Sequence, residues 1–223
     1  MASLYDVRQY VYQTFADRAA VNVSDVAIRF NISEKEALHS LRLLHDEHLI
    51  VLDNDRRNII MAHPWAAKNL GFVVASSQQK WWGGCAWDSF AIPSLINEKC
   101  LVATHCPSCG HTIAMDVDPD RPPQNANDVV AHFLVPVRDM WNDVVYSCSN
   151  QLLFCNRMHV EEWLQRTGNT FGTVLDLPTL WTLATQWYAG RLTPEYRRRT
   201  ADEAAAFFES IGLRGDFWCT KNI

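Results

Sequence analysis

Residues 81–90 place a thiol and a carboxylate three positions apart in the apolar sequence WWGGCAWDSF. If this stretch is helical, Cys85 and Asp88 lie on one face, because side chains at i and i+3 are neighbours on a helix. Gly83 and Gly84 allow a sharp turn directly before such a helix and so predict Cys85 at or near its N-terminus. The free N–H groups and the dipole there stabilise a thiolate, which is both a nucleophile and a ligand for soft metals.

Asp88 suits this chemistry because a carboxylate can take the thiol proton or hand a proton to an atom held on sulfur. The pair alone also fits two structural roles, a capping carboxylate in a first helical turn and a free cysteine in the core. A partner thiol elsewhere in the chain would favour the chemical role.

A second pair of thiols lies in THCPSCGH, at residues 104–111. The turn from Cys106 to Cys109 has the form of one knuckle of a zinc ribbon, in which two thiolates share a tight turn. A tetrahedral zinc site needs four ligands, and the sequence has no second CxxC. The remaining candidate ligands are Cys148, Cys155, His105 and His111. The spacing therefore favours a hairpin turn with two structural thiols over a structural zinc.

A third thiol, Cys148, follows a run of β-branched and aromatic residues. The segment 143–148, DVVYSC, predicts a strand that ends at this cysteine. A side chain in that position can point into a pocket beside a helix start, so Cys148 is the candidate partner of Cys85.

The first 65 residues predict three helices followed by a β-hairpin, which is the winged-helix order. The third helix has a capping-box signal, because Ser33 lies three residues before Glu36. The predicted helices cover residues 5–18, residues 24–30 with Ser24 as the cap, and a segment that starts after Ser33. The predicted strands cover residues 48–52 and 58–62. We expect residues 1–65 to form a winged-helix-like domain.

The charge of this segment argues against DNA binding. Residues 1–65 carry seven Lys/Arg and nine Asp/Glu, and the would-be recognition helix, SEKEALHSLRLLHDEHL, has four acidic residues against two basic ones. Phosphate contacts supply most non-specific DNA affinity, so a net negative helix is poorly suited to enter a groove. We therefore expect a structural or dimerising winged helix and no nucleic-acid partner.

Residues 66–223 change to short strands mixed with helices. The predicted strands are 72–76, 100–106, 111–117, 129–135 and 143–148. The predicted helices are 159–166, 178–189 and 201–211, the last with Thr200 as cap and Glu203 reaching back, and 118–128 is a polar loop. The fold class is therefore α+β, with a mixed or antiparallel sheet core and flanking helices after the N-terminal domain.

Composition limits the class of protein. The 223 residues are 48% hydrophobic and carry a net charge of -5, which permits a sizeable core and gives no basic footprint for membrane or nucleic acid. No apolar run reaches the roughly 18 residues of a membrane helix, and the N-terminus lacks a signal-peptide pattern. Seven cysteines, an odd number, favour reduced thiols over a disulfide framework. These features predict a cytoplasmic enzyme or binding protein.

Four short segments occur in a fixed order in the second half of the chain. They are CAWDSFAIPSLI at 85–96, HC at 105–106, YSCSNQLLF at 146–154 and VEEW at 160–163. In order and spacing they resemble the organomercurial (alkylmercury) lyase family. The likeness covers roughly residues 65–165, and the winged-helix start is similar to that family's N-terminal domain.

The resemblance implies a role for each matching position. The family's two mercury-binding thiols fall on Cys85 and Cys148. Its proton-transferring carboxylate falls on Asp88, which would also contact mercury, and its third, structural cysteine falls on Cys106. The implied reaction, a step of mercury resistance and detoxification, is protonolysis of a carbon–mercury bond, which yields a hydrocarbon and Hg(II) held by two thiolates.

The resemblance also implies that no cofactor is required and that excess external thiol is a co-reactant. Low-molecular-weight thiols or a mercuric reductase would accept the Hg(II). The residue types suit the implied reaction, because sulfur is the soft ligand that a soft cation prefers and a carboxyl group can protonate the leaving carbon. Trp81, Trp82 and Trp87 would wall the site for an organic group, although core packing fits them equally.

Two other functions stay open at the level of sequence. One is an enzyme of the same fold that acts on a non-mercurial substrate, and the other is a thiol-based metal-binding or metal-responsive regulator with a winged helix. Cys109, Cys155 and Cys219 are thiols that the family motif does not require. The run Arg197–Arg199 is expected to be a solvated patch.

Overall fold

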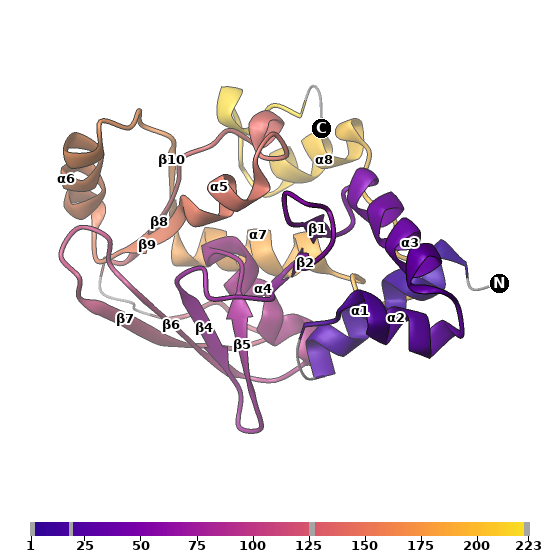
Figure 1. The fold of residues 1–223 in the computed structure, drawn as a ribbon. Coiled ribbons are helices and arrows are strands. Elements are labelled where there is room, and N and C mark those ends of the chain that lie inside the picture. Colours follow the sequence, from indigo (N-terminus) through magenta and orange to yellow (C-terminus); the bar gives the residue numbers. More distant parts are fainter. Residues whose placement is uncertain (1–2, 18–19, 125–127, 221–223) are drawn as a thin grey trace.

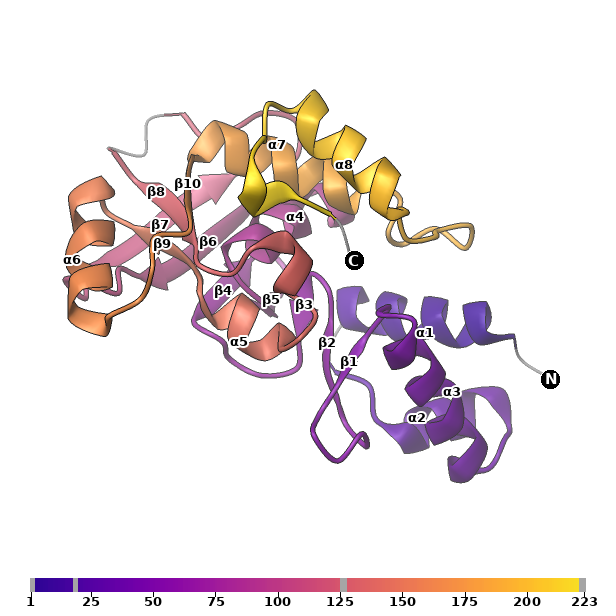
Figure 2. The ribbon, with the colours of Figure 1, turned by 90° about the horizontal axis from the view of Figure 1, so that it is seen from above.

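Two antiparallel sheets and a set of helices make up the part of the chain that the computed structural model describes, residues 3–17, 20–124 and 128–220. The helices are α1 (Leu4–Asp17), α2 (Val23–Phe30), α3 (Glu34–Asp46), α4 (Ala86–Ile96), α5 (Val144–Ser149), α6 (Arg157–Thr167), α7 (Leu177–Tyr188) and α8 (Ala201–Ser210). In both views α6 lies at the opposite end of the molecule from α1–α3 (Figures 1 and 2). The prediction of an α+β fold is confirmed.

The larger sheet has seven strands in the order β1-β2-β3-β5-β4-β6-β7, and every pair in it is antiparallel. Its strands are β1 (Val51–Leu52), β2 (Ile59–Ala62), β3 (Trp65–Ala66), β4 (Phe72–Ala75), β5 (Lys80–Gly83), β6 (Cys100–His105) and β7 (Thr112–Val117). Because β2 pairs with β3, the hairpin predicted at 48–62 belongs to the same sheet as the later strands.

The smaller sheet has three antiparallel strands in the order β10-β8-β9. They are β8 (Val130–Phe133), β9 (Gln151–Phe154) and β10 (Thr173–Asp176). The middle strand β8 is buried along its whole length, as expected for a strand that is covered on both faces. Of the predicted loop 118–128, residues 125–127 lie outside the described residues.

Local capping signals fix the starts of several helices. The capping boxes predicted at Ser33 with Glu36 and at Thr200 with Glu203 are both present. The cap of α2 differs from the prediction: Asn22, rather than Ser24, accepts the N–H of Asp25. In return, the backbone N–H of Asn22 donates to the carboxylate of Asp25, which completes a capping box.

Helix α4 is the central element. Its residues from Ala86 to Pro93 are all buried, since it packs against strands of the larger sheet on one side and against α7 on another. A helix enclosed on several sides requires a mostly apolar surface. Asp88 and Ser89 are buried polar residues within this helix, and each is hydrogen-bonded.

The prediction of a strand over 143–148 is wrong. Residues 144–149 form the short helix α5, and the strand β9 follows it. The β-branched pair Val144 and Val145 favours a strand locally, but the side chain of Asp143 caps the N–H of Tyr146, 2.9 Å away, and starts a helical turn. Cys148 therefore lies on a helix rather than at a strand end.

Candidate functional site

Cys85, Asp88 and Cys148 line one pocket, with a cavity volume of about 100 Å³. Elements far apart in the sequence form its walls. They include α4, α5, the end of α7, and the segments around His48 and His63. All three predicted residues are nearly inaccessible to solvent, at 2%, 1% and 5% exposure respectively.

Cys85 is the N-cap of α4, as the sequence predicts. The backbone N–H of Asp88 points at its sulfur, with an N···Sγ distance of 3.4 Å. The thiol itself faces the Oε1 atom of Gln151, 3.0 Å away, and the sulfur of Cys148. The helix start thus holds the thiol in the wall of the pocket.

The carboxylate of Asp88 lies in the pocket and next to Gly84, the residue that precedes the helix cap. Its Oδ1 atom accepts a hydrogen bond from the Tyr188 hydroxyl, and its Oδ2 atom lies 3.9 Å from both Cys148 Sγ and His63 Nε2. Gly84 makes room for this orientation, because a Cβ there would lie 2.1 Å from Asp88 Oδ2. The carboxylate therefore has one oxygen held by Tyr188 and one that faces the thiols.

Cys148 lies between Asp88 and His63. Its sulfur is 3.5 Å from His63 Nε2, and these three residues offer ligand atoms that all lie within 4.8 Å of one another. A sulfur, an imidazole nitrogen and a carboxylate oxygen at this separation can hold a metal ion or exchange a proton.

The two thiols differ in acidity. A hydrogen bond from Cys85 and the neighbouring His63 lower the pKa of Cys148 against the opposing effect of burial. Burial, the hydrogen bond to Cys148 and the charge of Asp88 raise the pKa of Cys85 well above its usual value. Cys148 is therefore the more acidic thiol of the pair.

The neighbouring groups complete this charge pattern. Burial lowers the pKa of His63, but Asp88 and Cys148 outweigh burial and leave it above the ordinary value. Burial and Asp88 raise the pKa of Tyr188, so its hydroxyl stays protonated and donates to the carboxylate. The pocket thus places an imidazole whose pKa is raised beside the thiol whose pKa is lowered.

This arrangement can bind a soft cation and protonate a group attached to it. Two sulfurs supply the soft ligands, while the neighbouring carboxylate can receive the proton that the second thiol releases on metal binding. The low exposure of all three side chains strengthens these electrostatic interactions by excluding water.

Of the three tryptophans expected to wall the site, Trp87 alone is among the pocket's lining residues. Its ring lies over the ring of Phe133, with 5.9 Å between centroids, and beside that of Trp187, at 5.4 Å. The indole N–H of Trp81 instead donates to the carbonyl of Ala16, so Trp81 joins the sheet to the end of α1. Trp82 points outward, on the opposite face of β5, and is 39% exposed.

The expectation of a solvated patch at Arg197–Arg199 is wrong for two of the three residues. Arg198 and Arg199 line the pocket together with Arg191. The Arg198 guanidinium lies 5.5 Å from the centroid of Trp141, and that of Arg199 lies 5.0 Å from the centroid of Trp187. Their aliphatic stems and planar heads cover aromatic rings, which places positive charge around the pocket.

Sequence patterns missed His63, Gln151 and Tyr188. His63 and Tyr188 lie outside the quoted motifs, and Gln151 lies within YSCSNQLLF but has no predicted role there. Each meets the thiol or carboxylate from 66 to 100 positions away in the chain. Only folding brings these residues to the site.

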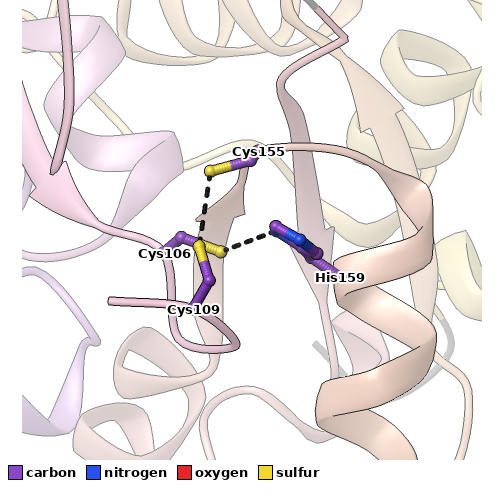
Figure 3. A group of neighbouring side chains, drawn as sticks. All are labelled: Cys106, Cys109, Cys155 and His159. Carbon is purple, nitrogen blue, oxygen red and sulfur yellow. Dashed lines mark hydrogen bonds between the residues drawn. The ribbon is translucent and has the colours of Figure 1, made fainter. Parts of the chain in front are cut away.

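The remaining thiols lie elsewhere. Cys106 and Cys109, predicted as structural thiols, lie at the turn between β6 and β7 and do not line the pocket. They face Cys155 and His159 at the start of α6 (Figure 3). Cys219 belongs to neither group.

Comparisons with known proteins bear on the family and the fold of this chain. The sequence profile of the alkylmercury lyase family matches residues 66–189, more than half of the chain. Among solved structures, the mercury-bound form of MerB2 is similar, with a TM-score of 0.66 and 15% sequence identity, covering 85% of this chain and 91% of that one. None of the curated proteins compared matches this chain.

Proposed function

This chain belongs to the alkylmercury lyase family, and on that premise we propose that Cys148, Cys85 and Asp88 carry out the protonolysis of a carbon–mercury bond. The substrate is an organomercurial cation bound to an external ligand, and the products are a hydrocarbon and Hg(II) held by two thiolates. The observation that carries the proposal is the position of Asp88 Oδ2, 3.9 Å from the Cys148 sulfur in a pocket shared with the Cys85 thiol.

Capture begins at Cys148. Its thiolate attacks mercury and displaces the external ligand, which leaves with the electron pair of its bond to mercury. We place the first attack at Cys148 because its pKa is lowered, with His63 as one cause, whereas the pKa of Cys85 is raised. The organic group lies against Trp87 and neighbouring apolar side chains of the pocket.

Cys85 adds as the second ligand. Binding to mercury makes its thiol acidic, and the released proton passes to Asp88, whose charge acts on Cys85 in the free enzyme. Mercury then carries the organic group and two thiolates, which raise the electron density on the carbon bound to mercury.

Asp88 finishes the reaction. It delivers the proton to carbon as the carbon–mercury bond breaks, and the electrons of that bond form the new carbon–hydrogen bond. The Tyr188 hydroxyl keeps Oδ1 hydrogen-bonded, so that Oδ2 faces the thiols. Hg(II) remains on Cys85 and Cys148, and the carboxylate has returned to its starting state.

Product release and partners extend this proposal. External thiols remove Hg(II) by ligand exchange, and the positive charge of Arg191, Arg198 and Arg199 around the pocket attracts anionic thiolates. Low-molecular-weight thiols or a mercuric reductase act as acceptors, which suits a cytoplasmic location with reduced thiols. No cofactor takes part in the steps above. None of the described helices combines the length and hydropathy that a membrane crossing needs.

We also propose that residues 1–65 form a winged-helix-like domain that supports the pocket, next to a catalytic domain over 66–223. Arg8 on α1 is buried and donates to the backbone carbonyl of Arg191, 2.5 Å away, next to the pocket wall. A helix whose buried cation holds that wall has a structural role, in agreement with the acidic character of α3.

The test of the function is direct. Incubating the protein with phenylmercury and excess thiol is expected to release benzene, measured by gas chromatography of the headspace, with repeated turnovers per chain. A protein that binds Hg(II) tightly but releases no benzene from phenylmercury, and no methane from methylmercury, would point instead to a non-mercurial substrate or to a metal-responsive regulator.

Replacing His63 with asparagine is expected to raise the pH at which Cys148 ionises, since the variant loses the cation that stabilises the thiolate. Alkylation of Cys148 by iodoacetamide near neutral pH should then slow several-fold, and its pH profile should move to higher pH. The rates are read by mass spectrometry of the Cys148 peptide. His39→Asn, at an exposed position on α3, is the matched control. An unchanged profile in the His63 variant would remove His63 from the mechanism.

A further inference from the structure

Four potential metal ligands converge outside the pocket. Cys106, Cys109, Cys155 and His159 each offer one ligand atom, and these four atoms all lie within 4.8 Å of one another. Figure 3 shows their side chains pointing toward one another from the β6–β7 turn and from the start of α6. The group is distinct from the catalytic residues, because none of its members lines the pocket.

Two of the ligand-to-ligand distances match those of a tetrahedral zinc centre. With Zn–S of about 2.3 Å and Zn–N of about 2.0–2.1 Å, a tetrahedron places two sulfurs about 3.8 Å apart and a sulfur and a nitrogen about 3.5 Å apart. The Cys109 and Cys155 sulfurs are separated by 3.8 Å, and Cys106 Sγ lies 3.5 Å from His159 Nδ1. A sulfur–sulfur distance of 3.8 Å is far from the roughly 2.05 Å of a disulfide.

The backbone positions two of the ligands at the β6–β7 turn and the other two at the start of α6. At the β6–β7 turn, the N–H of Gly110 donates to the carbonyl of Cys106, and Gly110 has φ +72°, so the chain doubles back and both cysteines face the same way. At the other side, Cys155 directly precedes Asn156, which caps α6, and His159 follows in the first turn.

We propose that Cys106, Cys109, Cys155 and His159 form a structural Zn(II) site of the Cys3His type. Three thiolates and one imidazole nitrogen are a donor set that zinc takes in closed, four-coordinate sites, where no position is left for substrate. The sequence-based preference for a simple hairpin turn rested on two assured ligands, and folding supplies the other two.

The zinc ion links the two sheets. The β6–β7 turn belongs to the larger sheet, whereas Cys155 directly follows β9 of the smaller one. Two hydrogen bonds also join α6 to the β6–β7 turn. Arg166 donates to the carbonyl of Pro107, and Ser108 donates to Glu162, with an O···O distance of 2.8 Å. Since β9 also carries Gln151, the metal fixes the strand that holds a neighbour of Cys85.

The experiment measures metal in the purified full-length chain and in variants. We expect about one zinc per chain by elemental analysis, lost from Cys109→Ser and from Cys155→Ser but kept in Cys219→Ser and in Cys148→Ser. The Cys109 side chain is exposed, so its replacement leaves the core intact. Removing zinc with a chelator should lower the unfolding midpoint by roughly 10 °C.

Cobalt(II) provides a second readout on the wild-type chain after chelation. Cobalt added to the stripped protein should give the intense visible bands of tetrahedral coordination and thiolate charge transfer, and Cys155→Ser should weaken them. The proposal is overturned if the stripped chain binds neither zinc nor cobalt, or if zinc is lost with Cys148→Ser and kept with Cys109→Ser and Cys155→Ser. A Cys109–Cys155 disulfide, found by mass spectrometry in the protein as purified, would overturn it as well.

Discussion

Replacing Asp88 with asparagine is expected to lower the turnover of phenylmercury by about 10²–10⁴-fold, the contribution typical of a positioned general acid. Asparagine has nearly the same shape, and its carbonyl can still accept the hydrogen bond from Tyr188. Its amide cannot carry the thiol proton to carbon, so mercury is captured but the carbon–mercury bond persists. Benzene release under single-turnover conditions measures the loss.

Binding must be measured in the same variant. Hg(II) bound per chain, determined by equilibrium dialysis, should stay close to the wild-type value because both thiols remain. Asp116→Asn is a matched control, since Asp116 is an exposed carboxylate that pairs with Lys99. If Asp88→Asn turns over at the wild-type rate, another group must donate the proton.

Replacing Cys148 with serine is expected to reduce benzene release by about 10³-fold or more, as the loss of a primary nucleophile typically does. A serine hydroxyl does not ionise near neutral pH and is a hard ligand that a soft cation disfavours. The variant should therefore fail at capture, before any proton moves. Benzene release and the mass of the phenylmercury adduct on the intact protein report the two steps separately.

Cys85→Ser separates the roles of the two thiols. It should retain one phenylmercury group per chain on Cys148 yet release no benzene, because the second thiolate and its proton are missing. Cys219→Ser is the control and should behave as wild type. Capture that survives in Cys148→Ser and disappears in Cys85→Ser would reverse the proposed order of attack.

Local sequence accounts for much of the site. The position of Cys85 at the start of α4 and of Asp88 three residues later depends on glycines, caps and helix geometry within a few residues. The capping boxes of α3 and α8 are local in the same sense. The prediction of a strand failed at α5, where β-branched residues favour a strand but the capping side chain of Asp143 starts a helix.

The sequence by itself determined the reactive types, two thiols and a carboxylate, and the short-range geometry of Cys85 and Asp88. Tertiary structure decided which thiol is the more acidic, since His63 reaches Cys148 across 85 residues of sequence. It also decided how the carboxylate is held, because Tyr188 donates to Asp88 from 100 positions away. Helical spacing is set by local hydrogen bonds, whereas pKa values and ligand sets depend on burial and on neighbours that only the packed chain brings together.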